Sequence, residues 1–381
     1  MSQEEVHKIP VVEIAYEALL AAMTTPSQPL FDQIKTAYEF NGLGILTVVG
    51  VPKLETLRSR LLPQAAKFAS LPPETKAKTE TPHAFFQVGW SYGNEKLQGD
   101  QPDWAKGSYY ANPLIDRPSN DEILIKRFPA FLEPNVWPTE DLPDFEPAFK
   151  ELGQLVVSVG RLIAKQCDDY VASVCDGYTK GKFHKLLTES KCCKGRLLHY
   201  FPSDEVEKKI GKTGSSISDN DFSDWCGWHN DHGSLTGLVP AIYSNASGEI
   251  VPNPDPDSGL YIRSRSGKLV KVVLPKVDNC ISFQIGETSQ IHTGGILQAT
   301  PHAVRGAMGD KSKGISRQTF AVFMEPEYNG EMELPHGKTV ADVQNSEAEK
   351  NLPSSVKTLG SRWKAGQDFG EFSDATFSAF Y

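Results

Sequence analysis

The sequence lacks any long apolar run. No stretch approaches the ~18 consecutive apolar residues that mark a membrane-spanning helix. It also lacks clusters of Lys and Arg. With 39 basic against 48 acidic residues the formal net charge is −9, and no basic patch interrupts this acidic background. Because nucleic acids and anionic membranes attract such patches, we expect neither a nucleic acid nor a membrane as a partner.

Cysteine is sparse as well. The six cysteines show no C-x-x-C spacing, a pattern typical of free thiols in a reducing compartment. Residues 1–14 mix acidic and polar side chains, and they show neither the apolar segment of a secretory signal nor an Arg-rich amphipathic pattern. We therefore expect a cytoplasmic protein.

The composition is that of an ordinary globular protein, with 39% hydrophobic, 23% charged and 10% aromatic residues. A chain of 381 residues allows two or three domains, but all-β folds often reach about 200–250 residues as one unit. We interpret the chain as one large domain with a helical N-terminal part.

The N-terminal part alternates short strands with helices. Residues 9–14 are mostly β-branched and predict a strand, the apolar spacing over 29–38 predicts a helix, and 43–49 predict a second strand. The segment 54–69 has helical character but contains Pro63, which predicts a kink or two separate pieces.

The next part has one strong signal. Residues 77–140 combine many aromatics with Gly, Pro and Asp, and they predict long loops with short strands. From Phe149 to Ile163 apolar residues then recur at steps of three and four. This spacing predicts that 145–170 form the longest amphipathic helix of the chain.

Beyond Lys194 the pattern changes to short β segments separated by turn residues, which is typical of a sandwich or barrel. The predicted strands are 196–201, 235–243, 260–263, 269–273, 280–285, 296–300 and 317–324. Two stretches rich in turn-forming residues, 203–224 and 244–258, predict surface loops.

The sharpest local feature is His229-Asn230-Asp231. In an extended chain positions i and i+2 project to the same face, so one imidazole and one carboxylate can converge on a metal ion. His302 is the natural third ligand, because it ends a predicted β segment after a Gly-Gly turn. Two His and one carboxylate on one face of an octahedron leave three positions open, as in non-haem Fe(II) oxygenases.

A second pair of residues lies on the last predicted strand. Arg317 and Thr319 are again i and i+2, so a guanidinium and a hydroxyl would point to the same side. The guanidinium donates two charge-assisted hydrogen bonds in a fixed geometry, and together with the hydroxyl it suits a carboxylate.

Taken in order, these motifs resemble those of the Fe(II)/2-oxoglutarate-dependent oxygenases of the isopenicillin N synthase-like group. The matching C-terminal motifs are Trp228-His229-Asn230-Asp231, Ser234-Leu235-Thr236, Gln284-Ile285-Gly286-Glu287, Thr300-Pro301-His302 and Arg317-Gln318-Thr319. Residues 9–12, 38–49 and 68–72 resemble the N-terminal region of that family, so the resemblance spans roughly residues 8–328.

The resemblance implies a mainly β protein with flanking helices (α+β), built on a double-stranded β-helix (jelly-roll) core. It implies an N-terminal non-haem dioxygenase-type region over 1–190, an oxygenase core over 191–328 and a C-terminal tail over 329–381. Carried over residue by residue, His229, Asp231 and His302 match the catalytic Fe(II) ligands. Arg317 and Thr319 match the pair that binds the distal carboxylate of 2-oxoglutarate.

The implied activity is that of a dioxygenase. Oxidative decarboxylation of 2-oxoglutarate with O2 would drive hydroxylation, desaturation or ring closure of a small organic substrate. One alternative is a 2-oxoglutarate-independent oxidase resembling isopenicillin N synthase, in which Arg317 and Thr319 would hold a substrate carboxylate. Another alternative is a non-catalytic jelly-roll binding protein.

Two features of the sequence depart from the family pattern. Residues 309–314 lengthen the connection after His302, which we interpret as a hairpin, and Phe201 stands where relatives often have Tyr.

The remaining candidates have structural interpretations. His232 would point away from Asp231, and His292 is expected at the surface or in a hydrogen bond. His199 could face the core or the substrate, and Arg196 and Arg305 are expected to be surface or structural charges. Trp225, Cys226 and Trp228 could line a pocket or belong to the core.

Substrate specificity in such a fold comes from loops around the site. These are expected to be 77–115, 203–228 and the tail beyond Pro326. We expect a monomer that acts on a small-molecule substrate.

Overall fold

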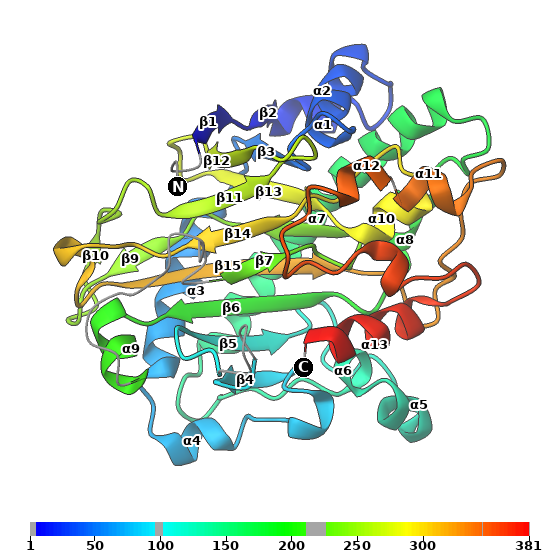
Figure 1. Ribbon diagram of the computed structural model, residues 1–381. Helices are drawn as coiled ribbons and strands as arrows, with labels where there is room; N and C mark the ends of the chain where they lie inside the picture. The colour runs from blue at the N-terminus through cyan, green and yellow to red at the C-terminus, as the bar shows by residue number, and fades with distance from the viewer. Residues whose placement is uncertain (1–4, 96–101, 211–225, 345, 381) are drawn as a thin grey trace.

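Two β-sheets form the centre of the molecule (Figure 1). The computed structural model describes residues 5–95, 102–210, 226–344 and 346–380. The smaller sheet has five strands in the order β1-β12-β11-β14-β7. Its strands are β1 (Val6–Pro10), β12 (Leu269–Val273), β11 (Gly259–Arg263), β14 (His302–Arg305) and β7 (Cys226–His229).

The larger sheet has ten strands, with the main path β2-β3-β13-β8-β15-β6-β5-β4 and with β9 and β10 beside it. Its strands are β2 (Val12–Ala15), β3 (Ile45–Val49), β13 (Cys280–Ile285), β8 (Leu235–Leu238), β15 (Ser316–Met324), β6 (Lys194–Tyr200), β5 (Lys106–Ala111), β4 (Gly89–Tyr92), β9 (Ile242–Ser244) and β10 (Ile250–Val251).

The two sheets pack face to face through apolar side chains. Leu198, Tyr200 and Ala321 of the larger sheet belong to one cluster with Val304 of β14. A second cluster packs Ile45 against side chains of β11 and β12. The N-terminal strands are part of this arrangement, because β1 pairs with β12 and β3 pairs with β13. The predicted sandwich of sheets with flanking helices is therefore the observed architecture.

Helices α3 (Leu54–Ala69) and α7 (Phe145–Val174) cover the other face of the larger sheet. Two glycines permit the close approach of α7. A Cβ at Gly237 of β8 would lie 2.3 Å from Val156 Cγ1, and one at Gly160 would lie 2.5 Å from Met324 Sδ. Phe149 of α7 meets Phe320 of β15 edge-to-face at 4.9 Å. The predicted long helix thus forms the backing of the sheet.

Shorter helices surround this core. They are α1 (Tyr16–Ala21), α2 (Gln28–Tyr38), α4 (Pro73–Ala77), α5 (Glu122–Arg127), α6 (Pro129–Leu132), α8 (Lys182–Glu189), α9 (Ser203–Ile210), α10 (Glu287–His292), α11 (Val340–Gln344), α12 (Ser346–Glu349) and α13 (Phe369–Phe380). None of the helices in the described ranges is long and apolar enough to cross a membrane.

The C-terminal tail docks on the body of the protein. Trp363, Phe369 and Phe372 are buried in a cluster that also contains Phe131 of α6 and Ile291 of α10. Figure 1 shows α13 lying beside α6, at the same end of the molecule as α10. The tail therefore covers one end of the two sheets.

Several local predictions need correction. Helix α3 is continuous through Pro63, so the two-piece alternative is wrong. Its apolar face, including Leu61, Leu62 and Phe68, is buried in the main core, and this packing outweighs the backbone hydrogen bond that proline cannot donate. The predicted strand 235–243 is divided into β8 and β9 around Pro240.

The predicted strand 296–300 is absent. Its backbone leaves the sheet, since Gln298 N donates to Tyr38 O and Ala299 N donates to Gln290 Oε1. His302 therefore begins a strand rather than ending one.

The two predicted surface loops have different outcomes. Of the stretch 203–224, the first eight residues form α9, and 211–224 lie outside the described residues. The stretch 244–258 is loop apart from Ser244, which ends β9, and the short β10. The predicted hairpin after His302 is instead a crossing from one sheet to the other, because β14 and β15 lie in different sheets.

The close contact of α7 with the sheet predicts that Gly237→Ala lowers the free energy of unfolding by about 1–3 kcal/mol, since the added methyl overlaps Val156. Urea unfolding monitored by circular dichroism measures this change. The double variant with Val156→Ala should be less destabilised than the sum of the two single variants. An unchanged stability of Gly237→Ala would contradict this packing.

Candidate metal centre

The pairing of β7 with β14 places two histidines opposite each other in the smaller sheet. In the antiparallel register His302, the first residue of β14, faces His229, the last residue of β7. Their ring centroids are 4.2 Å apart. Because directly opposed residues of an antiparallel pair have closely spaced side chains, the pairing by itself brings both imidazoles to one place.

Asp231 completes this group. Its Oδ1 lies 3.8 Å from His229 Nε2 and 3.9 Å from His302 Nε2. The three ligand atoms all lie within 4.8 Å of one another, and within the described part of the chain no other group of His, Cys, Asp and Glu side chains is arranged in this way. The structure thus brings together the three residues that the sequence indicated.

The orientation of the two imidazoles suits a metal ion. Nδ1 of His229 lies 2.7 Å from Gly227 O, and Nδ1 of His302 lies 3.3 Å from Thr300 O. A carbonyl oxygen only accepts, so each Nδ1 donates its hydrogen, and each Nε2, the atom nearer Asp231, is the one available to a metal ion. The Oδ2 atom of Asp231 is buried without a protein hydrogen-bond partner. A divalent cation would satisfy this orphaned carboxylate oxygen, so the residues fit such an ion.

The charge state of the two histidines differs. Burial, reinforced by the nearby His229, lowers the pKa of His302 to about 4. Burial also acts to lower the pKa of His229, but Cys226 and then Asp231 outweigh it and raise that pKa to about 9. A metal binds the neutral imidazole, so binding here would release the proton of His229.

Arg317 and Thr319 lie on β15, in the larger sheet. Their neighbours Gln318 and Phe320 alternate with them, and Phe320 packs against α7. Arg317 and Thr319 therefore face the space between the two sheets. The guanidinium of Arg317 lies over the ring of Tyr200, its partner across the strand pair, with 5.0 Å between the guanidinium carbon and the ring centroid.

The Thr319 hydroxyl donates to Val239 O at 3.2 Å. The ring of Tyr200 packs against the guanidinium of Arg317. Tyr200 was not singled out from the sequence, although it directly precedes Phe201, which departs from the family pattern.

A buried ionic cluster lies on the strands next to β15. Glu95 pairs with Arg196 of β6 at 2.5 Å and with Lys106 of β5 at 3.0 Å, and Lys106 also pairs with Asp103. Burial raises the pKa of Glu95, but Arg196 and then Lys106 lower it to about 2. The expectation that Arg196 is a structural charge agrees with this network, whose other members, Glu95, Lys106 and Asp103, were not singled out from the sequence.

The other histidines stay outside the metal centre. His199 is buried on β6, where its Nδ1 lies 3.3 Å from Gln318 Nε2. His232 stacks on Phe369 of the tail and is not part of the metal-binding group. His292 is hydrogen-bonded as expected, to Glu331 O at 3.0 Å, but it is buried rather than exposed.

The tryptophans beside the metal motif have different outcomes. Trp228 lies under Arg263. Trp225 falls outside the described residues.

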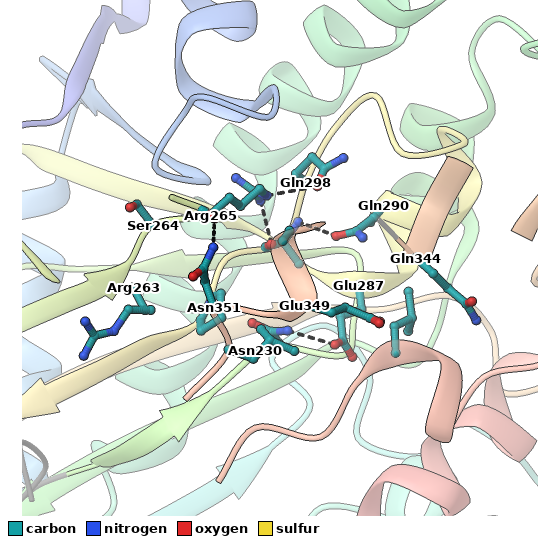
Figure 2. Close-up of a pocket in the computed structure, with 15 residues that line it drawn as sticks. Asn230, Arg263, Ser264, Arg265, Glu287, Gln290, Gln298, Gln344, Glu349 and Asn351 are labelled. Atoms are coloured by element: carbon teal, nitrogen blue, oxygen red, sulfur yellow. Dashed lines mark hydrogen bonds between the residues drawn. The ribbon is translucent and has the colours of Figure 1, made fainter. Parts of the chain in front are cut away.

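A polar cavity of about 40 Å³ lies beside Asn230, the residue between His229 and Asp231 (Figure 2). It is bounded by α10, by the loop before His302 and by the tail, and its lining includes Asn230, Glu287, Gln290, Gln298, Arg265 and Asn351. A polar space of this size has room for water.

Arg265 anchors the loop that precedes His302. It donates to Ala299 O and to the Thr300 hydroxyl on one side, and to Phe40 O and Gly42 O on the other. The sequence did not reveal this buried anchor, because its partners are far apart in the chain.

Comparisons with known proteins agree with this architecture. Residues 9–140 match the sequence model of a family described as "non-haem dioxygenase in morphine synthesis N-terminal". The sequence has no match among curated proteins.

Solved structures are similar over nearly the whole chain. A 2OG-Fe(II) oxygenase family protein from Caulobacter crescentus has a TM-score of 0.64 at 18% identity, covering 97% of this chain and 98% of that one. Full-length T7H of Neurospora crassa in complex with alpha-KG has a TM-score of 0.63 at 18% identity, covering 97% and 95%. JOX2 in complex with 2OG, Fe and JA has a TM-score of 0.57 at 16% identity, covering 98% and 90%. The predicted fold class and the predicted resemblance are confirmed.

Burial of His292 makes stability depend on pH. Burial lowers the pKa of His292 from 6.5 to about 3, so below pH 6.5 the unfolded chain binds a proton that the folded chain does not. The free energy of unfolding contributed by this residue therefore falls as the pH drops from 6.5 toward 3. His292→Gln keeps a donor for Glu331 O but does not titrate. Between pH 6 and 4.5 the free energy of unfolding of the variant should fall less steeply than that of the wild type. The two slopes should differ by about 1.4 kcal/mol per pH unit. Urea unfolding across this range measures both slopes, and equal slopes would contradict a neutral buried His292.

Proposed function

We propose that this protein, which has the fold of the Fe(II)/2-oxoglutarate oxygenases and a matching N-terminal region, couples oxidative decarboxylation of 2-oxoglutarate to oxidation of a small organic substrate. The observation that carries the proposal is the convergence of His229, Asp231 and His302 within 4.8 Å. Two imidazoles and one carboxylate form the facial set of ligands that leaves three positions of an octahedral Fe(II) open. The bound iron would supply the redox chemistry that activates O2 for attack on a C–H bond.

The protein side chains would hold and shield the reactants. Arg317 and Thr319 would bind the distal carboxylate of 2-oxoglutarate by charge-assisted and hydroxyl hydrogen bonds. The contact of Arg317 with Tyr200 restricts the guanidinium before the carboxylate arrives. The apolar cluster around Leu198, Ala321 and Val304 excludes water between the sheets, which strengthens these polar contacts.

The substrate is proposed to be small and to carry polar groups. Arg196 of β6 lies directly opposite Ala321 of β15, and Lys106 of β5 lies opposite Tyr200, which in turn lies opposite Arg317. Charged groups therefore border the space between the sheets. The structural neighbours were solved with small molecules, among them thymine in Neurospora crassa T7H and JA in JOX2. The segments 77–115 and 203–228, together with the tail, are proposed to select the substrate.

We further propose that the protein acts as a cytoplasmic monomer. All six cysteines are free, and five of them are buried, as expected in a reducing compartment. The division that we propose is 1–190 for the N-terminal region, which also contributes strands to both sheets, 191–328 for the core with the candidate metal ligands, and 329–381 for the docked tail.

The proposal predicts a visible metal-to-ligand charge-transfer band when Fe(II) and then 2-oxoglutarate are added anaerobically to metal-free protein. His302→Ala should abolish stoichiometric iron binding and the band. Arg317→Met should keep iron binding but raise the Kd for 2-oxoglutarate about tenfold to a hundredfold, because a hydrogen bond to a charged group is worth about 1.5–3 kcal/mol. Arg161→Met, which removes a guanidinium from the outer helix α7, is the matched control.

The other outcomes separate the alternatives. Tight iron binding without the band would favour the 2-oxoglutarate-independent oxidase, in which Arg317 and Thr319 hold a carboxylate of the substrate. Absence of iron binding in the wild type would overturn both enzymatic proposals and leave a binding protein.

A further inference from the structure

The residue between the two ligands of the His-x-Asp motif is bonded to the C-terminal tail through one carboxylate. Asn230 Nδ2 donates to Glu287 Oε1 at 3.0 Å, a contact drawn in Figure 2. Arg362 Nη2 donates to the same oxygen at 2.6 Å. A single oxygen of Glu287 thus joins the metal motif to a residue of the tail.

The ionic pair between Glu287 and Arg362, at the centre of this series of contacts, is buried. The side chains of Glu287 and Arg362 are 2% and 5% exposed. Arg362 is fixed further by the Thr376 hydroxyl at 3.0 Å and by Lys357 O at 3.3 Å. A buried pair with supporting hydrogen bonds is costly to break, because removal of one partner leaves the other charge unpaired in a dry environment.

The backbone of the metal motif is bonded to the same helix. The backbone N–H of Glu287 donates to Asp231 O at 2.8 Å, and the Thr288 hydroxyl donates to His232 O at 2.6 Å. Strand β7 ends at His229, so Asp231 lies beyond the last pair of the sheet. Contacts with α10, rather than strand pairing, therefore set the position of the carboxylate ligand.

The tail also contacts the residue that follows Asp231. The ring of His232 stacks on Phe369 with 5.7 Å between centroids and 9° between planes, and it meets the edge of Phe377 at 5.3 Å. Asn230 and His232 flank Asp231, and both are held by side chains that the tail supplies or fixes. The tail segment 359–377 thus contacts the residues on both sides of Asp231, His232 directly and Asn230 through Glu287.

We propose that this tail segment is a positioning element of the metal centre, acting through Arg362, Glu287 and Asn230 on the spacing of His229 and Asp231. This inference rests on the proposed iron site. Groups that orient metal ligands typically change metal affinity by about 10- to 100-fold when they are removed. The positioning role of the tail is therefore a property of metal binding itself, measurable without turnover.

The test measures the Kd for Fe(II), and for Co(II) as an air-stable probe, by anaerobic titration of the metal-free full-length protein at a temperature where every variant is folded. Asn230→Ala cuts the link to the motif and leaves the Glu287–Arg362 pair in place. It should raise the Kd about tenfold or more with a small change in Tm. Arg362→Met should raise the Kd similarly and also lower the Tm. Arg362→Lys should recover part of the affinity, because it restores the charge next to Glu287.

The matched control is Asp169→Asn, which removes the partner of Lys165 in a half-buried pair on α7, away from the metal motif. It should lower the Tm and leave the Kd of the folded protein unchanged. The double variant Asn230→Ala/Arg362→Met should bind metal about as weakly as the weaker single variant, since both changes cut the same chain of contacts.

Three outcomes are decisive. An unchanged Kd in Asn230→Ala, with wild-type protein binding one equivalent of metal, would overturn the positioning role and leave the proposed function intact. Wild-type protein that binds no metal would instead overturn the proposed function. If Arg362→Met does not fold, Asn230→Ala alone decides, because it leaves the buried pair in place.

Discussion

The antiparallel pairing of β7 with β14 is the constraint on which the candidate site depends. It fixes His229 opposite His302, and a slip of one residue would turn one imidazole to the other face of the sheet. The two partners are not equally supported. Strand β14 is held between β11 and β7, whereas among the described residues β7 is the last strand on its side of the smaller sheet. The candidate metal centre therefore has one of its three residues, His302, within the sheet and two at its margin, and the margin is contacted by α10 and the tail.

The space between the sheets combines two environments that serve different tasks. Side chains such as Leu198, Ala321 and Val304 make it dry, which favours strong electrostatic contacts. The cluster of Glu95, Asp103, Arg196 and Lys106 brings charge next to the same sheet, with two carboxylates for two cations. Because these charges are balanced within the protein, the cluster adds no unpaired ion to the space between the sheets.

Local patterns in the sequence carried most of what could be predicted. The spacing of His229 and Asp231 indicated a shared face, and the steps of three and four along α7 indicated the backing helix, because both signals depend on residues close in the chain. The division of 235–243 also has a local signal, since Pro240 cannot donate to a ladder.

Long-range contacts explain what the sequence could not show. Glu287 and Arg362 are 75 positions apart, and no periodicity marks them as partners. The segment 296–300 has the composition of a strand, but it bonds to Tyr38, Gln290 and Arg265 instead. The conformation of these residues depends on tertiary contacts with distant parts of the chain, and neighbouring residues in the sequence do not reveal such contacts.

The place of Arg362 in the chain gives the metal centre an order of assembly during translation. A ribosome adds the ligands at 229, 231 and 302 before it reaches residue 362. At about 5–20 residues per second the interval after the last ligand is on the order of several seconds. During this time a nascent chain has all three ligands, while Glu287 still lacks the guanidinium that pairs with it. A nascent chain that has not yet reached residue 362 therefore lacks the contact through which the tail is proposed to position Asp231.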